Sequence, residues 1–148
     1  MNVILIGAGR GSRLMPLTDT EPKCFTRIGG KRILDWITQA FSSTGLDRFV
    51  FIGGYLIDVV RHDCPVFLMV GNTGWQSNNI LFFLLHAREY MSTGFYFSYT
   101  DTLFRPKAVA ALRTSPHEVN LVKETKRLGR IQQHPHDPQP EPQNTRAQ

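Results

Sequence analysis

The fold of this chain is decided by the stretch Val3–Arg13, which reads VILIGAGRGSR. Its first residues, VILI, are apolar and mostly β-branched, a pattern that predicts a short buried strand. A turn follows with glycine at alternate positions, Gly7, Gly9 and Gly11. Glycine lets the backbone approach a ligand closely and lets several N–H groups point at one anion. With the cations Arg13 and Lys23 beside it, the turn is best suited to a triphosphate.

Other interpretations of this turn compete with a triphosphate site. Gly7–Ser12 is close to the dinucleotide-binding fingerprint G-x-G-x-x-G, with serine in place of the last glycine. That fingerprint opens a long helix, whereas Pro16 and Pro22 disfavour one because proline disrupts a helix interior. A P-loop fails because no Gly-Lys-Ser/Thr triplet closes the glycine run. A turn that only reverses the chain stays open, but it needs neither Arg13 nor Lys23. We expect an extended loop that wraps a ligand and brings Lys23 to it.

A longer signature runs through the same region and continues beyond it. It consists of Gly9-x-Gly11-Ser12-Arg13-Leu14-x-Pro16-Leu17-Thr18, then Pro22-Lys23, then Ile28-Gly29-Gly30-Lys31. This pattern resembles the nucleotidyltransferases that make nucleotide-sugars and CDP-choline-type products. Residues 6–9 read Ile-Gly-Ala-Gly, where the family usually has Leu-Ala-Ala-Gly. The resemblance covers roughly Met1 to Val122 and implies a domain that binds a nucleoside triphosphate.

Downstream of Lys31, apolar strands alternate with amphipathic helices. This alternation predicts an α/β fold with a mostly parallel sheet and crossover helices, whose ligands lie at the carboxyl ends of the strands. The resemblance implies a Rossmann-like three-layer α/β/α sandwich, here truncated. The predicted helices span residues 33–41, 56–62, 79–91 and 106–112, and the predicted strands span residues 48–52, 65–70, 94–99 and 119–122. Helical spacing predicts an apolar stripe on two of these helices. In the first helix it consists of Ile33, Leu34, Ile37, Ala40 and Phe41, and in the third of Ile80, Leu81, Leu84, Leu85 and Ala87.

A polar stretch from Gly71 to Ile80 is a second candidate for ligand contact, because it follows a predicted strand. An amide side chain donates and accepts hydrogen bonds, so it can read a base edge or a ribose hydroxyl. Ser77 or Asn78 can also cap the next helix. The pattern Trp-x-x-Asn-Asn-Ile resembles the phosphocholine cytidylyltransferase-like branch of the family, which implies base contacts from Asn78 or Asn79. The alternative is that these asparagines only start the helix.

Asp101 follows the last strong strand, in the sequence Thr-Asp-Thr-Leu-Phe. A carboxylate at the tip of a core strand, at the same edge as the glycine turn, is well placed to bind Mg²⁺. The resemblance implies that this aspartate holds the metal that bridges the phosphates. A turn-forming aspartate is the alternative. If the triphosphate interpretation is right, Asp101 has to lie close to Lys23.

The bulk properties exclude several other classes of protein. A chain of 148 residues has the size of one ordinary domain, and no apolar run reaches the ~20 residues of a membrane span. No signal peptide is recognisable, and Cys24 and Cys64 lack metal-ligand spacing, so we expect reduced thiols in a cytoplasm. The net charge of +5 is spread along the chain, which disfavours nucleic acid as a partner.

The C-terminal residues differ in composition from the rest of the chain. We expect a nucleotide-binding domain over residues 1–122 and a disordered basic, Pro- and Gln-rich tail over residues 123–148, because this tail has few apolar residues to bury. His134 and His136 fit a flexible tail better than a metal site. Family members are usually longer and carry a later acidic cluster that has no match here. We therefore expect a truncated or frameshifted copy, or alternatively a natural short form that only binds nucleotide.

The resemblance implies transfer of NMP from an NTP to a phosphorylated acceptor with release of pyrophosphate. CTP and a phosphocholine-like acceptor are favoured by the asparagine-rich loop, and Mg²⁺ is the implied cofactor. An inactive nucleotide-binding remnant and an NAD(P)-binding module are the alternatives; the latter lacks the acidic residue after the second strand. The implied catalytic residues are Arg13 and Lys23, the implied metal ligand is Asp101, and the implied nucleotide-binding residues are Gly7, Ala8, Gly9, Gly11, Ser12, Arg13, Asn78 and Asn79.

Overall fold

The computed structural model describes residues 1–77 and 79–122. The chain divides into one unit from Met1 to Ser115 and a second that begins at Pro116. The strand predicted at 119–122 is wrong, since these residues have no regular structure and the side chains of Val119 and Leu121 are 89% exposed. Without a buried face they have nothing to hold them in a sheet. Asn78, the predicted tail over residues 123–148, and His134 and His136 lie outside the described residues.

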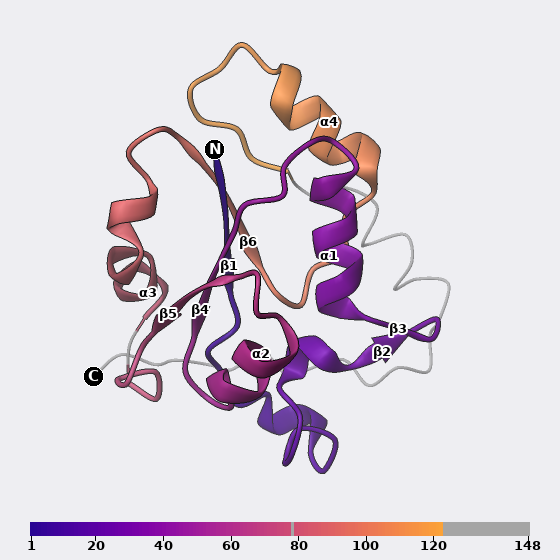
Figure 1. The fold of residues 1–148 in the computed structure, drawn as a ribbon, viewed down its shortest axis with the longest axis vertical. Coiled ribbons are helices and arrows are strands. Elements are labelled where there is room, and N and C mark those ends of the chain that lie inside the picture. Colours follow the sequence, from indigo (N-terminus) through magenta and orange to yellow (C-terminus); the bar gives the residue numbers. More distant parts are fainter. Residues whose placement is uncertain (78, 123–148) are drawn as a thin grey trace, which may run out of the picture. The chain divides into compact units, whose positions relative to one another are not determined.

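A four-stranded parallel sheet forms the centre of the first unit (Figure 1). Its strands are β1 (Asn2–Ile6), β4 (Phe49–Gly53), β5 (Leu68–Gly71) and β6 (Phe95–Tyr99). The order is β5-β4-β1-β6, so the first strand lies between two later ones. The predicted parallel sheet is therefore confirmed. The third predicted strand begins late, at Leu68, because residues 64–67 form a turn in which the Phe67 amide donates to the Cys64 carbonyl at 3.1 Å.

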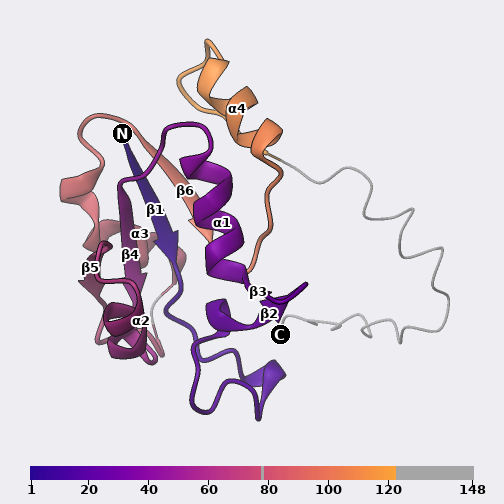
Figure 2. The same cartoon turned by 45° about the vertical axis from the view of Figure 1, so that its right-hand side comes forward.

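Three helices pack against the same buried cluster on one face of the sheet: α1 (Ile33–Ser42), α2 (Ile57–Asp63) and α4 (Pro106–Thr114). Val3 and Leu5 of β1 point toward this cluster. The predicted apolar stripe of α1 is confirmed, because all of its members are buried. They are Ile33, Leu34, Ile37, Ala40 and Phe41. Figures 1 and 2 show α1 and α4 on this side of the sheet.

The opposite face of the sheet carries α3 (Ile80–His86) and completes three layers (Figure 2). Ile4 and Ile6 point toward it, as strand alternation requires. The stripe predicted for this helix (Ile80, Leu81, Leu84, Leu85 and Ala87) is wrong in part. Phe83 and Ala87 are buried, whereas Leu81 is 61% and Leu85 is 52% exposed. The helix is rotated so that the larger Phe83 side chain packs on the sheet, and it ends at His86 instead of continuing to residue 91.

The segment after the glycine turn contains no long helix, as expected from its prolines. It forms short 3₁₀ turns at Ser12–Leu14 and Lys23–Phe25. A small hairpin follows, made of β2 (Arg27–Ile28) and β3 (Lys31–Arg32). Gly29 and Gly30 form its tip with φ of 60° and 80°, the left-handed conformation that a two-residue hairpin of this kind requires. The two glycines are visible in the sequence, but the hairpin was not predicted from it. Its strands are too short to show an alternation of apolar and polar residues.

Candidate functional site

All four strands of the sheet run in the same direction, so their carboxyl ends meet at one edge. A cleft of about 650 Å³ lies at this edge. The segments that follow β1, β5 and β6 contribute to its walls, together with α3. The lining residues are Ile6, Gly7, Ala8, Gly9, Gly11, Ser12, Arg13, Leu14, Lys23, Trp75, Ile80, Phe83, Tyr99, Thr100 and Asp101.

The start of the glycine turn is fastened to the sheet. The amide of Gly7 donates to the carbonyl of Ile52 at 3.0 Å. A Cβ at Gly7 would lie 2.5 Å from the ring of Phe51 and 3.0 Å from Oγ1 of Thr100, so only glycine fits there without a shift of the core. The backbone at Gly7 therefore packs closely against Phe51 and Thr100. The residues that follow it line the cleft.

The middle of the turn keeps its amides free for a ligand. Among the described residues, no acceptor pairs with the backbone N–H of Gly9, Arg10 or Gly11. Gly11 has φ of 67°, and its carbonyl accepts from the Leu14 amide at 2.8 Å and the buried Thr18 hydroxyl at 3.1 Å. Such a run of unpaired N–H groups, held in a fixed turn, is an anion-binding concavity.

Lys23 and Asp101 meet across the cleft. The Lys23 ammonium donates to a carboxylate oxygen of Asp101 at 2.7 Å, and the two side chains are 35% and 47% exposed. Thr100 fixes the end of β6 because its amide and its hydroxyl both donate to the Ile6 carbonyl, at 3.1 Å and 3.0 Å. The structure thus meets the expectation that these two groups, 78 residues apart, lie together beside the glycine turn.

Among the described residues, Asp101 is not accompanied by other acidic side chains that could complete a metal site. Within residues 1–77 and 79–122, no group of three or more His, Cys, Asp or Glu side chains could hold a metal ion. Mg²⁺ is commonly held by one or two carboxylates together with substrate phosphates. The donor set therefore fits a Mg²⁺ ion that arrives with phosphates, and it does not fit a metal held by the protein alone.

Asn79 lies at the start of α3, outside the set of residues that line the cleft. Its side-chain oxygen accepts from the amides of Leu81 and Phe82, at 3.0 Å and 3.2 Å, so it is the N-cap of the helix. The prediction that Ser77 or Asn78 caps this helix is wrong, since the N-cap is Asn79. The Ser77 hydroxyl donates to the Gly74 carbonyl at 3.3 Å instead. The capping bonds occupy the oxygen of Asn79 and leave its amide nitrogen for other contacts.

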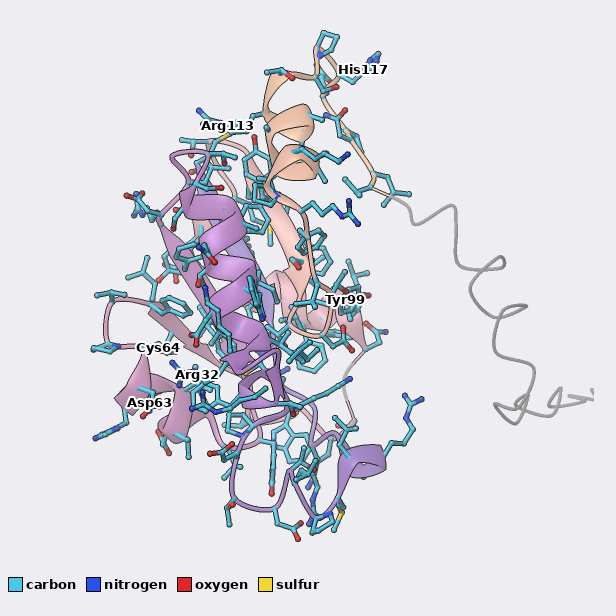
Figure 3. The ribbon with its side chains drawn as sticks, turned by 90° about the vertical axis from the view of Figure 1, so that its right-hand side faces the viewer. Arg32, Asp63, Cys64, Tyr99, Arg113 and His117 are labelled. Carbon is cyan, nitrogen blue, oxygen red and sulfur yellow. The ribbon has the colours of Figure 1, made fainter. Side chains whose placement is uncertain are left out.

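Several residues that line the cleft had no role predicted from the sequence. Thr100 precedes Asp101 at the end of a predicted strand, and this position could have been used to predict that it lines the cleft. Trp75 lies in the stretch from Gly71 to Ile80 that we predicted to contact a ligand, but no separate role was predicted for its ring. Phe83 was hidden by the wrong choice of helix face. Tyr99 ends β6 with 45% of its side chain exposed, and Figure 3 shows it projecting from the end of that strand.

A second charged cluster supports the segment that carries Lys23. The guanidinium of Arg32 bonds to Asp35 at 3.1 Å and to Asp63 at 2.8 Å, and it lies 4.3 Å from the centre of the Phe25 ring. Figure 3 shows Arg32 and Asp63 close together near the start of α1. The hydrogen bond that Arg32 donates to Asp35 raises the pKa of Arg32. This cluster ties the Lys23–Phe25 turn to α1 and α2.

Cys24 follows Lys23 directly but faces the core. Its side chain is 1% exposed, and burial raises the pKa of its thiol from 9.0 to about 12. A thiol with such a pKa stays protonated near neutral pH and is a poor nucleophile. Cys24 is therefore not a candidate nucleophile for the cleft.

The glycine turn, the signature lysine and the hairpin all fall in the part of the chain that matches a known family. Residues 1–56 match the family model described as "Nucleotidyl transferase". Over these residues the chain is similar to the nucleotidyltransferases. The resemblance seen in the sequence and the expected Rossmann-like α/β fold are both confirmed.

Individual nucleotidyltransferases are similar over most of this chain. The CTP:phosphoglutamine cytidylyltransferase of Campylobacter jejuni is 31% identical over 133 residues, which are 82% of this chain and 52% of the relative. The choline-phosphate cytidylyltransferase of Streptococcus pneumoniae is 25% identical over 108 residues, 71% of this chain and 47% of the relative. The solved structure of the inositol-1-phosphate CTP transferase from T. maritima matches with a TM-score of 0.62 and 27% identity, over 75% of this chain and 47% of that one.

These relatives are considerably longer than this chain. It spans about half the length of the curated relatives and of the solved structure that it matches. In the described residues, every helix is too short or too polar to cross a bilayer.

Proposed function

We propose that the cleft binds a nucleoside triphosphate and supports transfer of its NMP group to a phosphorylated acceptor, with release of pyrophosphate. The observation that carries this proposal is the meeting of Lys23 and Asp101 beside a glycine turn whose amides are unpaired among the described residues. Cations, free N–H groups and one carboxylate at a single edge suit a polyphosphate that travels with a divalent cation. We infer the class of reaction from the matched family. We infer how a triphosphate would bind from the geometry of the cleft.

In the proposed reaction, an oxygen of the acceptor phosphate attacks the α-phosphorus of the NTP. A bond forms from that oxygen to the α-phosphorus, and the bond from the α-phosphorus to the oxygen bridging the β-phosphate breaks, so pyrophosphate leaves. Positioning and charge neutralisation provide most of the catalysis in phosphoryl-type transfer. The turn amides from Gly9 to Ser12 cradle the phosphates, and Arg13 neutralises the charge that develops on the leaving pyrophosphate.

Lys23 is the proposed catalytic cation at the α-phosphate or at the acceptor phosphate. It stabilises the pentacoordinate state, because a fixed ammonium neutralises charge as it builds. Asp101 is the residue that would hold Mg²⁺ with the phosphates, and the bound ion supplies charge neutralisation and orientation of the α-phosphate. Because Asp101 pairs with Lys23 at 2.7 Å, this carboxylate also fixes the direction of the ammonium before a nucleotide arrives.

We propose that CTP is the preferred nucleotide and that the acceptor is a small phosphorylated compound, with phosphocholine as the first to test. The support is that the relatives from C. jejuni and S. pneumoniae are named as cytidylyltransferases and that the T. maritima protein is described as a CTP transferase. Ala8, which lines the cleft, and the amide nitrogen of Asn79 are the proposed base contacts. Asn78 remains part of the proposal on its sequence pattern alone.

The proposal is tested by calorimetric titration of the protein with CTP, UTP, GTP and NAD, each with and without Mg²⁺, followed by a pyrophosphate-release assay with phosphorylated acceptors. We expect CTP with Mg²⁺ to bind most tightly and pyrophosphate to appear when an acceptor is present. Absence of binding by every nucleotide would contradict the proposal. Binding without pyrophosphate release would support the alternative that this chain only binds nucleotide.

The role of Lys23 gives a sharper test of the mechanism. Lys23→Ala is expected to lower transfer by about 10²–10³, the usual loss when one group that stabilises developing charge is removed. The thermal transition is expected to stay near that of the wild type, because the Lys23 side chain is 35% exposed. Lys107→Ala, at an exposed position of α4, is the control for general loss of positive charge. Unchanged transfer in the Lys23→Ala variant would show that this role is wrong.

A further inference from the structure

Trp75 lines the cleft, and the proposed function gives it no role. Its ring is part-buried and lies among the lining residues, in the loop that follows β5. On its buried side it packs with the apolar cluster beneath α3. A large aromatic side chain that is anchored on one side and open to a cleft on the other is suited to cover the flat face of a ligand.

The position of the Trp75 ring is fixed by its surroundings. A Cβ at Gly54 would lie 2.4 Å from the Cβ and the Cγ of Trp75, so the backbone of Gly54 lies directly against the root of the ring. The Tyr55 ring packs beside it, with centroids 5.7 Å apart. The loop itself is held because the amide of Gly74 donates to the side-chain oxygen of the buried Asn72 at 3.0 Å. Trp75 is therefore preorganised, which lowers the entropic cost of contact with a ligand.

The strand order places Trp75 and Asp101 at different ends of the cleft. Trp75 follows β5 and packs on Gly54, which follows β4, whereas Asp101 follows β6. The glycine turn follows β1, which lies between β4 and β6. Neighbouring strands are ~4.8 Å apart, so the ends of β4 and β6 are separated by about 10 Å. The cleft thus runs from an aromatic end, past the unpaired amides, to a charged end.

The aromatic end has the composition of a site for a flat, partly apolar group. Ala8, Ile80 and Phe83 line the cleft together with Trp75, and these side chains offer no charge. Phosphates are stabilised at the other end, by Lys23 and the turn amides. A nucleoside triphosphate has the same polarity along its length, with a planar base at one end and the charged phosphates at the other.

Resting on the proposed function, we propose that Trp75 stacks on the base of the bound nucleoside triphosphate and sets the affinity for a nucleotide over a bare polyphosphate. Stacking of one base on an aromatic side chain changes affinity by roughly 5- to 150-fold. Because every base has a π-face, this contact favours nucleotides as a class and does not choose among CTP, UTP and GTP. The choice of base belongs to polar groups such as the Asn79 amide.

The two tryptophans of the chain allow a direct spectroscopic test. Trp36 lies on α1, away from the residues that line the cleft, so Trp36→Phe leaves Trp75 as the single fluorescent indole. We expect CTP with Mg²⁺ to quench this fluorescence, and inorganic tripolyphosphate with Mg²⁺ to bind without quenching it. Calorimetry on the same samples measures binding independently. Binding of CTP with no change in Trp75 fluorescence would overturn the stacking proposal.

Affinity measurements on substituted proteins give a second test. Trp75→Leu is expected to weaken CTP binding by roughly 5- to 150-fold and to leave tripolyphosphate binding unchanged, whereas Trp75→Phe, which keeps a π-face, retains most of the affinity. Trp36→Leu is the matched control, because Trp36 lies on α1 and is not among the residues that line the cleft. Equal weakening of CTP and tripolyphosphate by Trp75→Leu would overturn the proposal.

If the proposed function is wrong, the CTP and tripolyphosphate measurements give a different result. If the wild-type protein binds neither CTP nor tripolyphosphate, the cleft is not a polyphosphate site and both proposals fall together. If tripolyphosphate and CTP bind the wild type equally well, the polyphosphate site stands and the stacking by Trp75 does not. If Trp75→Leu fails to fold because of its contact with Gly54, the fluorescence of the Trp36→Phe protein still decides the question.

Discussion

At the scale of single residues, two glycines of the same turn are expected to respond differently to a methyl group. Gly11 has φ of +67°, and an added Cβ would lie 3.1 Å from Cβ of Lys23. Gly11→Ala is therefore expected to lower the free energy of unfolding by about 1–2 kcal/mol, the cost of a left-handed conformation in an L-residue. Gly9 has open space around its Cβ position, so Gly9→Ala is expected to leave stability unchanged.

The Gly9→Ala and Gly11→Ala variants also separate an effect on folding from an effect on nucleotide binding. Gly9 lines the cleft, so a methyl group there is expected to obstruct the approach of phosphates to the turn amides and to weaken CTP binding by at least tenfold, about 1.4 kcal/mol. Urea unfolding and CTP titration of both variants are the measurements. Full CTP affinity in a stable Gly9→Ala protein would mean that the phosphates do not approach the backbone at this point.

The thiol of Cys24 makes a pH-dependent contribution to stability. Its pKa in the folded protein is about 12, raised from 9.0 by burial. The folded state therefore binds this proton more tightly than the unfolded state does. The contribution is complete below about pH 9 and is lost as the pH rises from there through about 12, with a slope of up to about 1.4 kcal/mol per pH unit.

Urea unfolding of the wild type and of Cys24→Ala checks this prediction, at about pH 8 and about pH 10.5. The wild type is expected to lose more stability between these two conditions than the variant. Burial also raises the pKa of Cys64, and that contribution is present in both proteins, so the difference between them reports Cys24. Equal losses would show that Cys24 is accessible to solvent in the folded state.

Residue patterns explain why parts of the site were predictable from the sequence. Gly7, Gly11 and Lys23 stand at fixed spacing in a continuous segment, so one local signature identified them. Asp101 was reached through its position after a strand, and the 2.7 Å contact with Lys23 agrees with that expectation. Trp75 had no comparable signal, because its place in the cleft depends on packing against Gly54, which lies on a different strand end.

At the scale of secondary structure elements, the start of α3 allows capping and base contact to be separated. Asn79→Ala removes both capping hydrogen bonds and is expected to cost about 1 kcal/mol of stability. Asn79→Asp keeps an oxygen acceptor for the Leu81 and Phe82 amides but loses the amide donor. The Asp variant is therefore expected to keep wild-type stability and to lose discrimination between CTP and UTP.

Thermal unfolding and parallel CTP and UTP titrations measure the two effects of Asn79. If Asn79→Asp keeps the wild-type preference between the two nucleotides, Asn79 acts only as a helix cap. Ser77→Ala is a suitable control in the same loop, since the Ser77 hydroxyl bonds to Gly74 and not to the helix.

Elements were predicted well where an apolar pattern was unambiguous. The stripe of α1 has a single possible face, and the buried strands β1 and β4 are continuously apolar. In α3, by contrast, the sequence ILFFLL is apolar on every side. Periodicity cannot choose a buried face in such a helix, and packing of Phe83 on the sheet decides it. The strand predicted at 119–122 failed because local apolar residues do not form a strand without a neighbouring one.

At the scale of the whole molecule, the helices and strands of the described residues and the cleft lie within Met1–Ser115. A chain that ends at Ser115 is therefore expected to keep the thermal transition and the CTP affinity of the full chain. Differential scanning calorimetry and CTP titration of the two proteins make the comparison. A clear loss of either property would show that residues 116–148 contribute to the domain, contrary to the division of the chain after Ser115.

The central position of β1 has a consequence for synthesis on the ribosome. This strand emerges first, yet its pairing with β6 waits until residues 95–99 have been made. A nascent chain that has exposed only its glycine turn holds the amides and Lys23 but lacks Asp101. Because synthesis advances by about 5–20 residues per second, several seconds pass before the opposing carboxylate arrives. Affinity for nucleotide should therefore rise only once β6 has been made and has paired with β1.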